Sequence, residues 1–549
     1  MKIRTIALFL AVVLAIFALA GCSGESGSSQ AGRVDVIDNG EPIGLQKYVS
    51  PVTLTTFMSS SDTLERDLAM TEDGETVENN RFHRWFEEAL NIKLSYMWVA
   101  KGDAYNTKLN LAISSGQLPD VFLVNSIQAQ QLYKAGKIQP LTEIYNTYAT
   151  DYTKAYMESD AAGNDVFDTV TFDGELYGIP KMWSSYDSAE FLWVRQDWFD
   201  KYNLPAPTTM QNMLAAAERF AAEDPDGNGK QDTVGLGFLS TMNSSIGGMV
   251  GFFNGYHAYL GCFLRQDDGK LAYSNFLPEV KDALSSLSDL YQKGIISKEF
   301  ATTDQSRLTE LIISGKVGMF YGEHWMPLNP LQDSVQLDKN AVWKAYPLPS
   351  VDDTPASTQL NTGTTSWWVV NKNCANPEAI MKLINLSYTD ESEAPDYITK
   401  QDVTNYYSFN PILVQDPTVN IKQMDGFKKY LQGEQVDTQK NGLFLKIEQY
   451  ESYKSGNPNY WWVDQIYGIE GCPIQILKDN YLGEDRIVMN DFHGVSTPSM
   501  VKNSATLSKL VDQTFVEIIT GSKDVSALDD LQQQWLTLGG QSILDEVNA

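Results

Sequence analysis

An α/β protein with more than one domain is the fold that this sequence predicts, on three observations. Short apolar runs alternate along the chain with segments of helical periodicity, which is typical of sheets covered by helices. With 549 residues, the chain is too long for one compact core. Hydrophobic residues make up 43% and charged residues 20%, the ordinary balance of a globular protein. The chain can therefore bury sizeable cores in several layers.

The apolar runs predict strands and the periodic segments predict helices, in a regular order. The expected strands are residues 52–58, 121–124, 317–320 and 367–370. The expected helices are residues 104–115, which Gly116 ends, residues 209–222, which Thr208 or Thr209 caps, and a helix opened by residues 376–378. No internal repeat is visible, so we expect distinct domains rather than a solenoid.

The amino terminus carries a secretion signal. Lys2 and Arg4 precede an unbroken apolar run over residues 6–20, and Gly21 and Cys22 follow it. A run of about 15 residues is too short to favour spanning a bilayer. The last four residues, LAGC, resemble a bacterial lipobox, in which the cysteine receives the lipid. The alternative is an ordinary cleaved signal with a chance cysteine. We expect a signal peptide over residues 1–21 and lipidation at Cys22.

Residues 22–50 follow as a flexible tether, because they open rich in glycine and serine and show no apolar period. Beyond Cys22 the chain has only Cys262, Cys374 and Cys472, with no CxxC pair. This usage excludes a disulfide scaffold and a cysteine-zinc site. One bridge among the three stays open, since spacing does not decide it.

The charge of the chain is strongly negative. The formal net charge is −29, and removal of residues 1–21, with two basic residues and no acid, takes it to 39 − 70 = −31. Such a chain has no basic field to displace counterions from phosphates, so we expect no nucleic-acid partner. The same balance argues, more weakly, against an anionic ligand, although a local basic pocket could override the net field.

A series of short motifs resembles one known family. In chain order they are SSGQLPDVF (114–122), GKIQPL (136–141), DGELYGIPKMW (173–183), LWVRQDWFDKYNLPAPTT (192–209), the acidic loop described below, SGKVGMF (314–320), NPEAIMKLIN (376–385) and WLTLGGQSILDEVN (535–548). Together they are similar to the family 1 extracellular solute-binding proteins of ABC importers, the group with the LplA-like and alginate-binding proteins. The series covers nearly the whole mature chain.

The resemblance implies a two-lobe, periplasmic-binding-protein-like fold of type II, with a ligand cleft between lobes joined by several chain crossings. We place crossings near residues 180–190, 346–351 and 400–412. Lobe 1 would comprise residues 51–180 plus 351–400, and lobe 2 residues 181–350 plus 401–549. Such a protein binds its ligand as the lobes close, and a membrane permease then recognises the closed form. The implied protein is a lipid-anchored monomer on the outer face of the cell membrane.

The acidic loop EDPDGNGKQDTVG, residues 223–235, has the spacing of a calcium loop. Asp224, Asp226, Asn228 and Asp232 stand at positions 1, 3, 5 and 9, and Lys230 at position 7 offers its carbonyl oxygen. Alternating oxygen donors suit a hard cation, so we expect a structural calcium ion in lobe 2 over residues 224–235. Position 12 is Gly235, and Thr233 stands where the family often has an acid, which leaves the ligand shell short by one. The alternative is a solvated Asp/Asn/Gly turn.

The candidate ligand residues are aromatic and polar side chains at expected strand ends and crossings, where open α/β sheets bind ligands. A sugar offers apolar C–H faces and a rim of hydroxyls, so aromatic platforms with polar neighbours suit it. The candidates are Met58, Ser59, Asn125, Trp183, Tyr186, Glu323, His324, Trp325, Trp367, Tyr406 and Trp461. We interpret Arg195 and Asp197 instead as a structural ion pair. Any one of these aromatics could equally belong to a core.

We expect a binding protein rather than an enzyme. The sequence has no HExxH, GxSxG or phosphate-cradling GxxxxGK[ST] motif, and its four histidines show no ligand spacing. The main prediction is therefore an importer subunit that captures an oligosaccharide. The alternatives are a surface lipoprotein that senses or scaffolds carbohydrate, and, with less support, a secreted enzyme that acts on glycosides.

Overall fold

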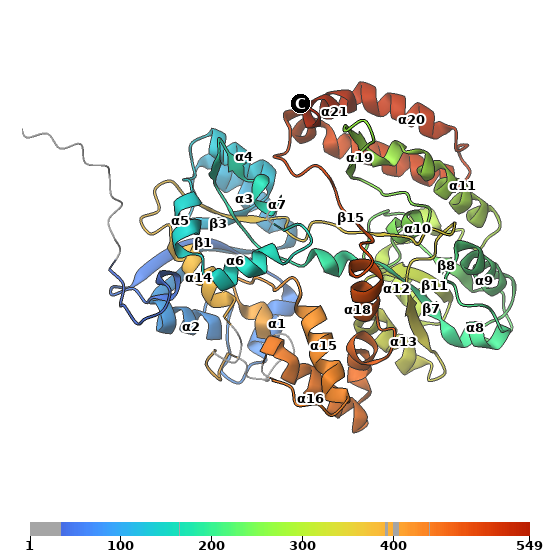
Figure 1. The fold of residues 1–549 in the computed structure, drawn as a ribbon, viewed down its shortest axis with the longest axis horizontal. Coiled ribbons are helices and arrows are strands. Elements are labelled where there is room, and N and C mark those ends of the chain that lie inside the picture. The colour runs from blue at the N-terminus through green and yellow to red at the C-terminus, as the bar shows by residue number, and fades with distance from the viewer. Residues whose placement is uncertain (1–34, 164, 390–393, 399–405, 439) are drawn as a thin grey trace, which may run out of the picture.

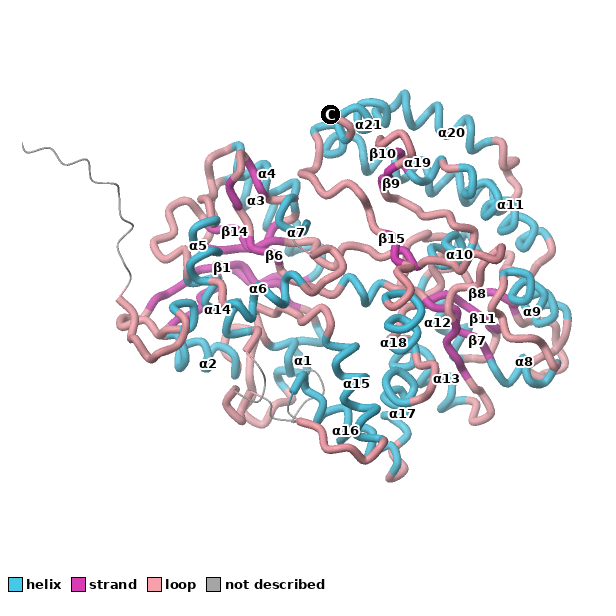
Figure 2. The backbone as a smooth tube through the Cα atoms, in the orientation of Figure 1, coloured by secondary structure: helices cyan, strands magenta, loops and turns pink. Residues whose placement is uncertain are grey.

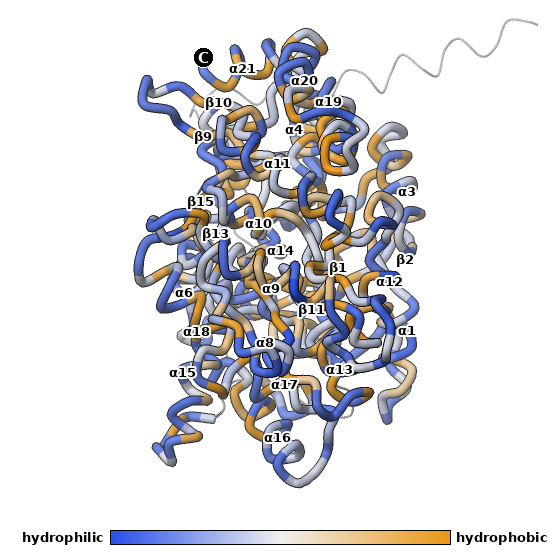
Figure 3. Tube along the Cα trace, turned by 90° about the vertical axis from the view of Figure 1, so that its right-hand side faces the viewer, coloured by the Kyte–Doolittle hydropathy of each residue, from blue (hydrophilic) through white to orange (hydrophobic). Residues whose placement is uncertain are grey.

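The computed structural model describes residues 35–549 apart from 164, 390–393, 399–405 and 439, and it has two large lobes and a smaller helical unit (Figure 1). Strands lie in the interior of each lobe and helices surround them (Figure 2). Hydrophilic residues gather on the outer helices and loops, as the view from the side shows (Figure 3). The predicted signal peptide, Cys22 and the first part of the tether lie outside the described residues.

The first lobe is built on two small sheets that meet through one carboxylate. Strands β1 (Val52–Ser60) and β2 (Ile92–Lys101) pair in parallel, and β14 (Trp367–Val370) pairs antiparallel with β3 (Val121–Val124) and β6 (Ile179–Pro180). Asp120 accepts hydrogen bonds from the backbone nitrogen and the hydroxyl of Thr55, at 2.9 and 2.5 Å. The strand predictions in this lobe are confirmed, and β1 runs two residues further than expected.

Helices cover the sheets of the first lobe on both faces (Figure 1). They are α1 (Asp62–Ala69), α2 (Arg81–Leu90), α3 (Gly102–Ser115), α4 (Ser126–Lys134), α5 (Thr142–Tyr148), α6 (Asp151–Glu158), α7 (Asp165–Asp168) and α14 (Ala379–Ser387). A short hairpin, β4 (Thr171–Phe172) and β5 (Glu175–Leu176), turns through Asp173 and Gly174, both with positive φ.

The second lobe has a four-stranded sheet in the order β12 (Trp343–Tyr346), β7 (Phe191–Arg195), β11 (Val317–Gly322), β8 (Val234–Gly237). Every residue of β7 and β11 is buried, which agrees with their continuous apolar sequences. The covering elements are α8 (Gln196–Tyr202), α9 (Met210–Ala222), α10 (Val250–Gly255), α11 (Pro278–Gln292), α12 (Gln305–Ile313), α13 (Gln332–Leu337), α19 (Pro498–Ile519), α20 (Ala527–Trp535), α21 (Gln541–Val547) and the hairpin β9 (Phe263–Arg265) and β10 (Leu271–Tyr273).

The predicted ion pair in this lobe is confirmed. Arg195 donates to both carboxylate oxygens of Asp197, at 2.8 and 2.7 Å, and also to Asp338 at 3.1 Å. Its guanidinium lies over the rings of Trp198 and Trp343. Since the side chain is almost fully buried, it serves to join β7, α8 and β12 rather than to meet a ligand.

A third, smaller core belongs to helices that lie below and between the lobes in Figure 1. They are α15 (Val419–Leu431), α16 (Leu443–Lys454), α17 (Trp461–Val463) and α18 (Pro473–Ile476). Ile421 and Trp461 pack against both this core and that of the second lobe. The expectation that residues 401–549 join lobe 2 as one body therefore needs correction, because residues 424–474 bury a cluster of their own.

The boundaries between the lobes also differ from those expected. Residues 351–360 stay with the second lobe, because Leu360 is buried there and β13 (Thr358–Gln359) pairs with β15 (Ile487–Val488). Residues 409–414 stay with the first lobe, because Phe409 and Ile412 are buried in its core. The second and third crossings thus lie at residues 361–366 and 415–418, several residues beyond the expected positions. Cys262, Cys374 and Cys472 are buried and free, so no disulfide joins them.

Candidate functional site

Three chain crossings meet at one place and form the hinge between the lobes. The Ser185 hydroxyl accepts a hydrogen bond from the Gly363 nitrogen at 2.8 Å, and the Ser188 hydroxyl accepts one from the Asn361 nitrogen at 2.9 Å. The Ser184 hydroxyl donates to the Pro417 carbonyl at 2.6 Å. Each bond joins the first crossing to the second or the third, so the three segments bend as a unit.

A buried carboxylate fastens the first crossing to the first lobe. Asp160 accepts hydrogen bonds from the Ser185 nitrogen and hydroxyl, at 2.7 and 2.5 Å, and from the Ala162 nitrogen at 3.1 Å. Tyr186 donates its hydroxyl proton to the Ser159 carbonyl at 3.2 Å. Three donors satisfy one carboxylate here, which is how a buried charge is tolerated.

Three contiguous pockets run along the boundary of the lobes at this hinge. The first, of 280 Å³, lies between Trp367 and α7 of the first lobe and the segment 489–500. The second, of 260 Å³, shares Asn490 with it. The third, of 470 Å³, shares Asn361 with the second and reaches the loop after β8. The first pocket is lined by both lobes, whereas the second and third are lined by the second lobe and by Asn361 of the second crossing; we call the three together the interlobe cleft.

The cleft presents hydroxyl and amide groups between aromatic rings. Hydroxyl and amide side chains of the second and third pockets include Thr241, Asn243, Ser244, Ser245, Gln359 and Asn361. In the first pocket Phe492 lies 6.1 Å from Phe263, ring to ring, and Trp367 faces the same hollow. Trp183, in the first crossing, is 43% exposed, unusually open for a tryptophan. Such a surface suits a ligand with hydroxyl groups and apolar faces.

The loop after β11 connects the cleft to the helical unit. Trp325 donates its indole proton to Glu323, and burial raises the pKa of Glu323 above its ordinary value. His324 is buried, with its Nε2 3.4 Å from the side-chain nitrogen of Asn420. Asn420 also donates to Asp187 at 2.9 Å and accepts from Tyr467. His324 therefore joins a network that crosses the hinge.

The structure separates the candidate ligand residues into groups. Glu323 and Trp367 line the cleft pockets, and Trp183 lies exposed beside them. Tyr186, His324 and Trp325 make the hinge contacts already described, and Trp461 is half-buried between two cores. The Tyr406 side chain lies outside the described residues. These assignments to a ligand stay predictions.

Two candidates, Met58 and Ser59, sit differently from where the sequence placed them, whereas Asn125 follows β3 as expected. Met58 and Ser59 lie inside β1 rather than after it, because the strand continues to Ser60. Asn125 caps α4: its side-chain oxygen accepts from the Gln128 nitrogen at 2.9 Å. That oxygen is engaged in holding the helix.

The sequence analysis missed two segments that line the cleft. The loop of residues 239–245 follows β8, whose glycine-rich sequence VGLG gave a weak strand signal. Recognition of that strand would have placed the loop at a strand end. The segment 489–496 leaves the second lobe and contacts the first, where the Gln130 side-chain amide donates to the Ser496 carbonyl at 3.3 Å. No local pattern marks it.

The predicted calcium loop is held by its own hydrogen bonds and by a lysine. The two carboxylate oxygens of Asp224 accept from the nitrogens of Asn228 and Gly229, at 3.0 and 2.7 Å. The Lys316 ammonium donates to Asp226 at 2.6 Å and to Asp232 at 2.8 Å. Lys316 and Asn228 lower the pKa of Asp232.

The donor set of the loop fits calcium in kind but is short. Asp224, Asp226, Asn228 and Asp232 supply side-chain oxygens, and Lys230 supplies a carbonyl. Thr233 is buried and donates its hydroxyl proton to the Phe220 carbonyl at 2.7 Å, so it faces away from the loop. In the described part of the chain no three acidic, histidine or cysteine side chains converge as a metal group would. An ion here would have to displace the Lys316 ammonium.

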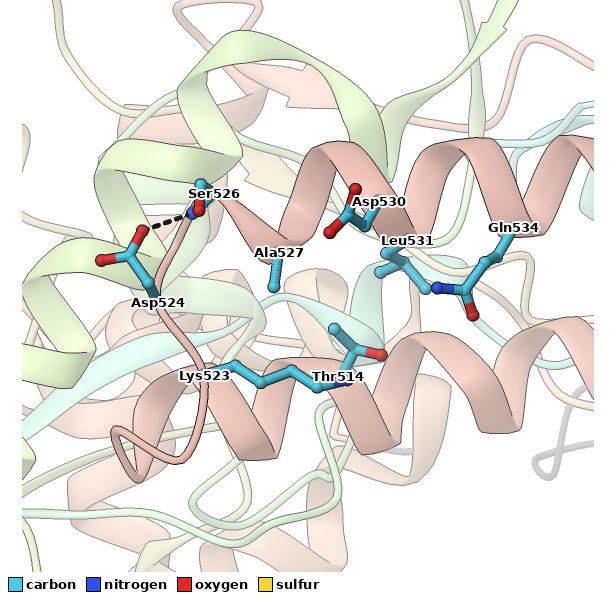
Figure 4. Close-up of a pocket in the computed structure, with 8 residues that line it drawn as sticks. All are labelled: Thr514, Lys523, Asp524, Ser526, Ala527, Asp530, Leu531 and Gln534. Atoms are coloured by element: carbon cyan, nitrogen blue, oxygen red, sulfur yellow. Dashed lines mark hydrogen bonds between the residues drawn. The ribbon is translucent and has the colours of Figure 1, made fainter.

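A further hollow, of 270 Å³, lies at the end of α19 and the start of α20 (Figure 4). Its wall comes from Thr514, Lys523, Asp524, Ser526, Ala527, Asp530, Leu531 and Gln534. All of them belong to the carboxyl-terminal helices and their connection, far along the chain from the hinge. It is a surface depression of one lobe. No helix among the described residues is long and apolar enough to cross a membrane.

Comparison with known proteins identifies the family. The profile of the bacterial extracellular solute-binding proteins matches residues 66–394, more than half of the chain. The chain belongs to this family. The resemblance found in the motifs is thereby confirmed, and so is the prediction that the protein is not an enzyme, since the family is one of solute-binding proteins.

Individual relatives agree in fold. The polygalacturonan/rhamnogalacturonan-binding protein YtcQ of Bacillus subtilis is 23% identical over 465 residues, 84% of this chain and 86% of that protein. Lipoprotein LipO of the same organism is 22% identical over 559 residues, 100% and 99% of the two chains. The crystallised Streptococcus pneumoniae protein FusA, in complex with kestose, superposes with a TM-score of 0.61 at 16% identity over 90% of this solute-binding protein and 98% of FusA. The predicted two-lobe type II fold is confirmed.

Proposed function

We propose that this solute-binding protein captures an oligosaccharide in the interlobe cleft and delivers it to the permease of an ABC importer. The observation that carries the proposal is the cleft itself. Hydroxyl and amide side chains lie there among aromatic rings, beside the hinge formed by the three chain crossings. The names of the relatives YtcQ and FusA, which mention polygalacturonan, rhamnogalacturonan and fructooligosaccharide, support a carbohydrate ligand. Closure of the lobes buries the ligand and creates the form that a permease recognises.

We also propose a lipid anchor at Cys22, which places the monomer on the outer face of the cell membrane. The lipobox-like sequence supports this, as does the relative named a lipoprotein. A sensor or scaffold role would use the same cleft. Stimulation of the cognate permease by the loaded protein would favour the importer, and its absence would favour the sensor.

Binding of an oligosaccharide is the first expected result. The purified protein should bind members of a broad glycan panel with a dissociation constant on the order of micromolar or below, with a change in tryptophan fluorescence because Trp183 lies at the hinge. Isothermal titration calorimetry measures the affinity. Binding of peptides in place of glycans would show that the carbohydrate assignment is wrong.

For the loop of residues 224–235 we propose a structural calcium ion, held by Asp224, Asp226, Asn228, Asp232 and the Lys230 carbonyl. Alternate oxygen donors and the positive φ of Gly229 support it. An ion bound only in the folded state stabilises that state. Because the loop lies at the carboxyl end of α9, away from the cleft pockets, it does not touch the ligand.

Chelation should therefore lower the melting temperature and leave ligand binding at low temperature intact.

The variant Lys316→Met should bind calcium more tightly than the wild type, because the ammonium that competes for Asp226 and Asp232 is gone. Scanning calorimetry with calcium or EDTA measures both effects. Lys344→Met, on the exposed side of β12, is the control. Loss of ligand binding at the calcium threshold, with the fold intact, would make the ion part of the ligand site instead.

A further inference from the structure

The ionisable side chains of the cleft are nearly all acidic. In the first pocket they are Asp165 and His493, in the second Asp512, and in the third Asp304 and Glu323. Among the residues that the structure describes, no lysine or arginine lines any of the three pockets. The one basic side chain that the structure describes in the three pockets is His493. Its Nδ1 lies 3.3 Å from the Asp165 carboxylate, so the two side chains pair with each other.

Apart from Asp165, the cleft acids form no ion pair among the residues that the structure describes. Asp304 accepts from the backbone nitrogen of Arg307 as the cap of α12, while the guanidinium of Arg307 turns to Glu310. Glu323 accepts from the Trp325 indole. Burial raises the pKa of Glu323, but no lysine or arginine of the described chain lines the pockets, so the potential of the cleft is negative wherever these acids are ionised.

The lysines beside the crossings do not reverse this balance. Lys422 donates to Asp416 of the third crossing at 2.7 Å, so its charge is already paired. Lys181 precedes the first crossing but lines none of the three pockets, and its burial lowers its pKa. The hinge itself adds the carboxylates Asp160 and Asp187.

We propose that this cleft selects an uncharged oligosaccharide and rejects oligomers of uronic acids. The inference rests on the proposed function and specifies its ligand class. Ligand hydroxyl groups would donate to the carboxylates and pair with Asn243 and Asn361, whose amides both donate and accept. A uronate carboxylate would meet acceptors of its own charge, and closure would bury it without a cationic partner. This protein would thereby differ from a relative whose name refers to polygalacturonan.

The decisive experiment compares ligands that differ only in charge. Trigalacturonate is titrated against its fully methyl-esterified form, beside neutral oligomers of galactose, glucose and fructose, by isothermal titration calorimetry at neutral pH. The best neutral oligomer should bind about 100-fold more tightly than any uronate at low salt. Added salt should strengthen the residual uronate binding and leave neutral ligands unchanged, because it screens repulsion.

Two variants test the electrostatic cause. Glu323→Gln keeps the acceptor for the Trp325 indole, and Asp304→Asn keeps the cap of α12, so both should fold. Each should raise the affinity for trigalacturonate about 5-fold or more, since one repulsive charge is removed. Glu434→Gln, an exposed acid after α15, is the matched control and should change nothing.

The outcomes separate the inference from the proposed function. Uronate binding as tight as neutral binding, or uronate binding that weakens with salt, overturns the inference and leaves the oligosaccharide-binding function standing. A glucosamine oligomer that binds more tightly than its N-acetylated form overturns the preference for an uncharged ligand. Unchanged uronate affinity in both variants overturns the electrostatic account. Failure of every glycan to bind overturns the proposed function itself.

Discussion

Replacement of Gly363 by alanine should disrupt the hinge. A Cβ at this position would lie 2.1 Å from the Trp183 carbonyl oxygen and 2.7 Å from the Ser185 nitrogen. Both are backbone atoms of the first crossing, so no side chain can rotate away and the two segments must separate. The hydrogen bond from the Gly363 nitrogen to the Ser185 hydroxyl would lengthen with them. We expect a loss of about 2 to 4 kcal/mol in the free energy of unfolding.

The same change should weaken ligand binding, because the hinge sets the relative position of the lobes on closure. Thermal melting measures the stability of the variant, and calorimetric titration with the best glycan measures its affinity below the melting range. Gly494→Ala is the matched control for stability, because it lies exposed and its Cβ would meet only the Phe492 ring, at 3.1 Å. It is not used for affinity, since Gly494 lines the first pocket. A Gly363→Ala protein with unaltered melting and affinity would contradict the close approach of the crossings.

Local sequence predicted the scaffold of this fold well. The runs VFLV, VGMF and WWVV contain no polar side chain, VTLTTFM mixes apolar residues with threonines, and each of the four lies in a strand. Thr209 caps α9 as expected, with its hydroxyl accepting from the Asn212 nitrogen. Such features depend on neighbours within a few residues, and periodicity and capping chemistry record them directly.

The hinge and the cleft could not be predicted from local sequence patterns. The Ser185–Gly363 bond joins residues 178 positions apart, and the pockets combine loops from three regions of the chain. The boundary near residue 351 was placed early because residues 351–360 carry no apolar period, although β13 pairs with β15 and Leu360 is buried in the core of the second lobe. A polar side chain after a strand, such as Asn125, can either contact a ligand or cap the next helix. Only the structure distinguishes these two roles.

The free energy of unfolding of the wild type, relative to that of Glu190→Gln, should fall as the pH rises from about 4.5 to about 8. Glu190 stands between the hinge and β7 and is fully buried, and that burial raises its pKa from 4.5 to about 8. Its carboxyl accepts one hydrogen bond, from the Gly251 nitrogen at 2.6 Å. The proximity of Glu323, a cleft acid, adds to the rise.

The direction follows from proton linkage. Below pH 4.5 the carboxyl of Glu190 is protonated in the folded and the unfolded chain, so it costs nothing. Between 4.5 and 8 only the unfolded chain ionises, and the folded state loses stability with each pH unit. Above 8 the loss is complete, on the order of 4 kcal/mol for this span of pKa values.

Glutamine has no proton to lose and still accepts from Gly251, so the difference in unfolding free energy between the two proteins should grow in favour of the variant across this window. Denaturant unfolding of the wild type and the variant at the same pH separates the effect of Glu190 from that of the other acids of the chain. If the difference between their free energies of unfolding stayed constant from pH 5 to pH 8, the Glu190 carboxyl would already be ionised in the folded protein.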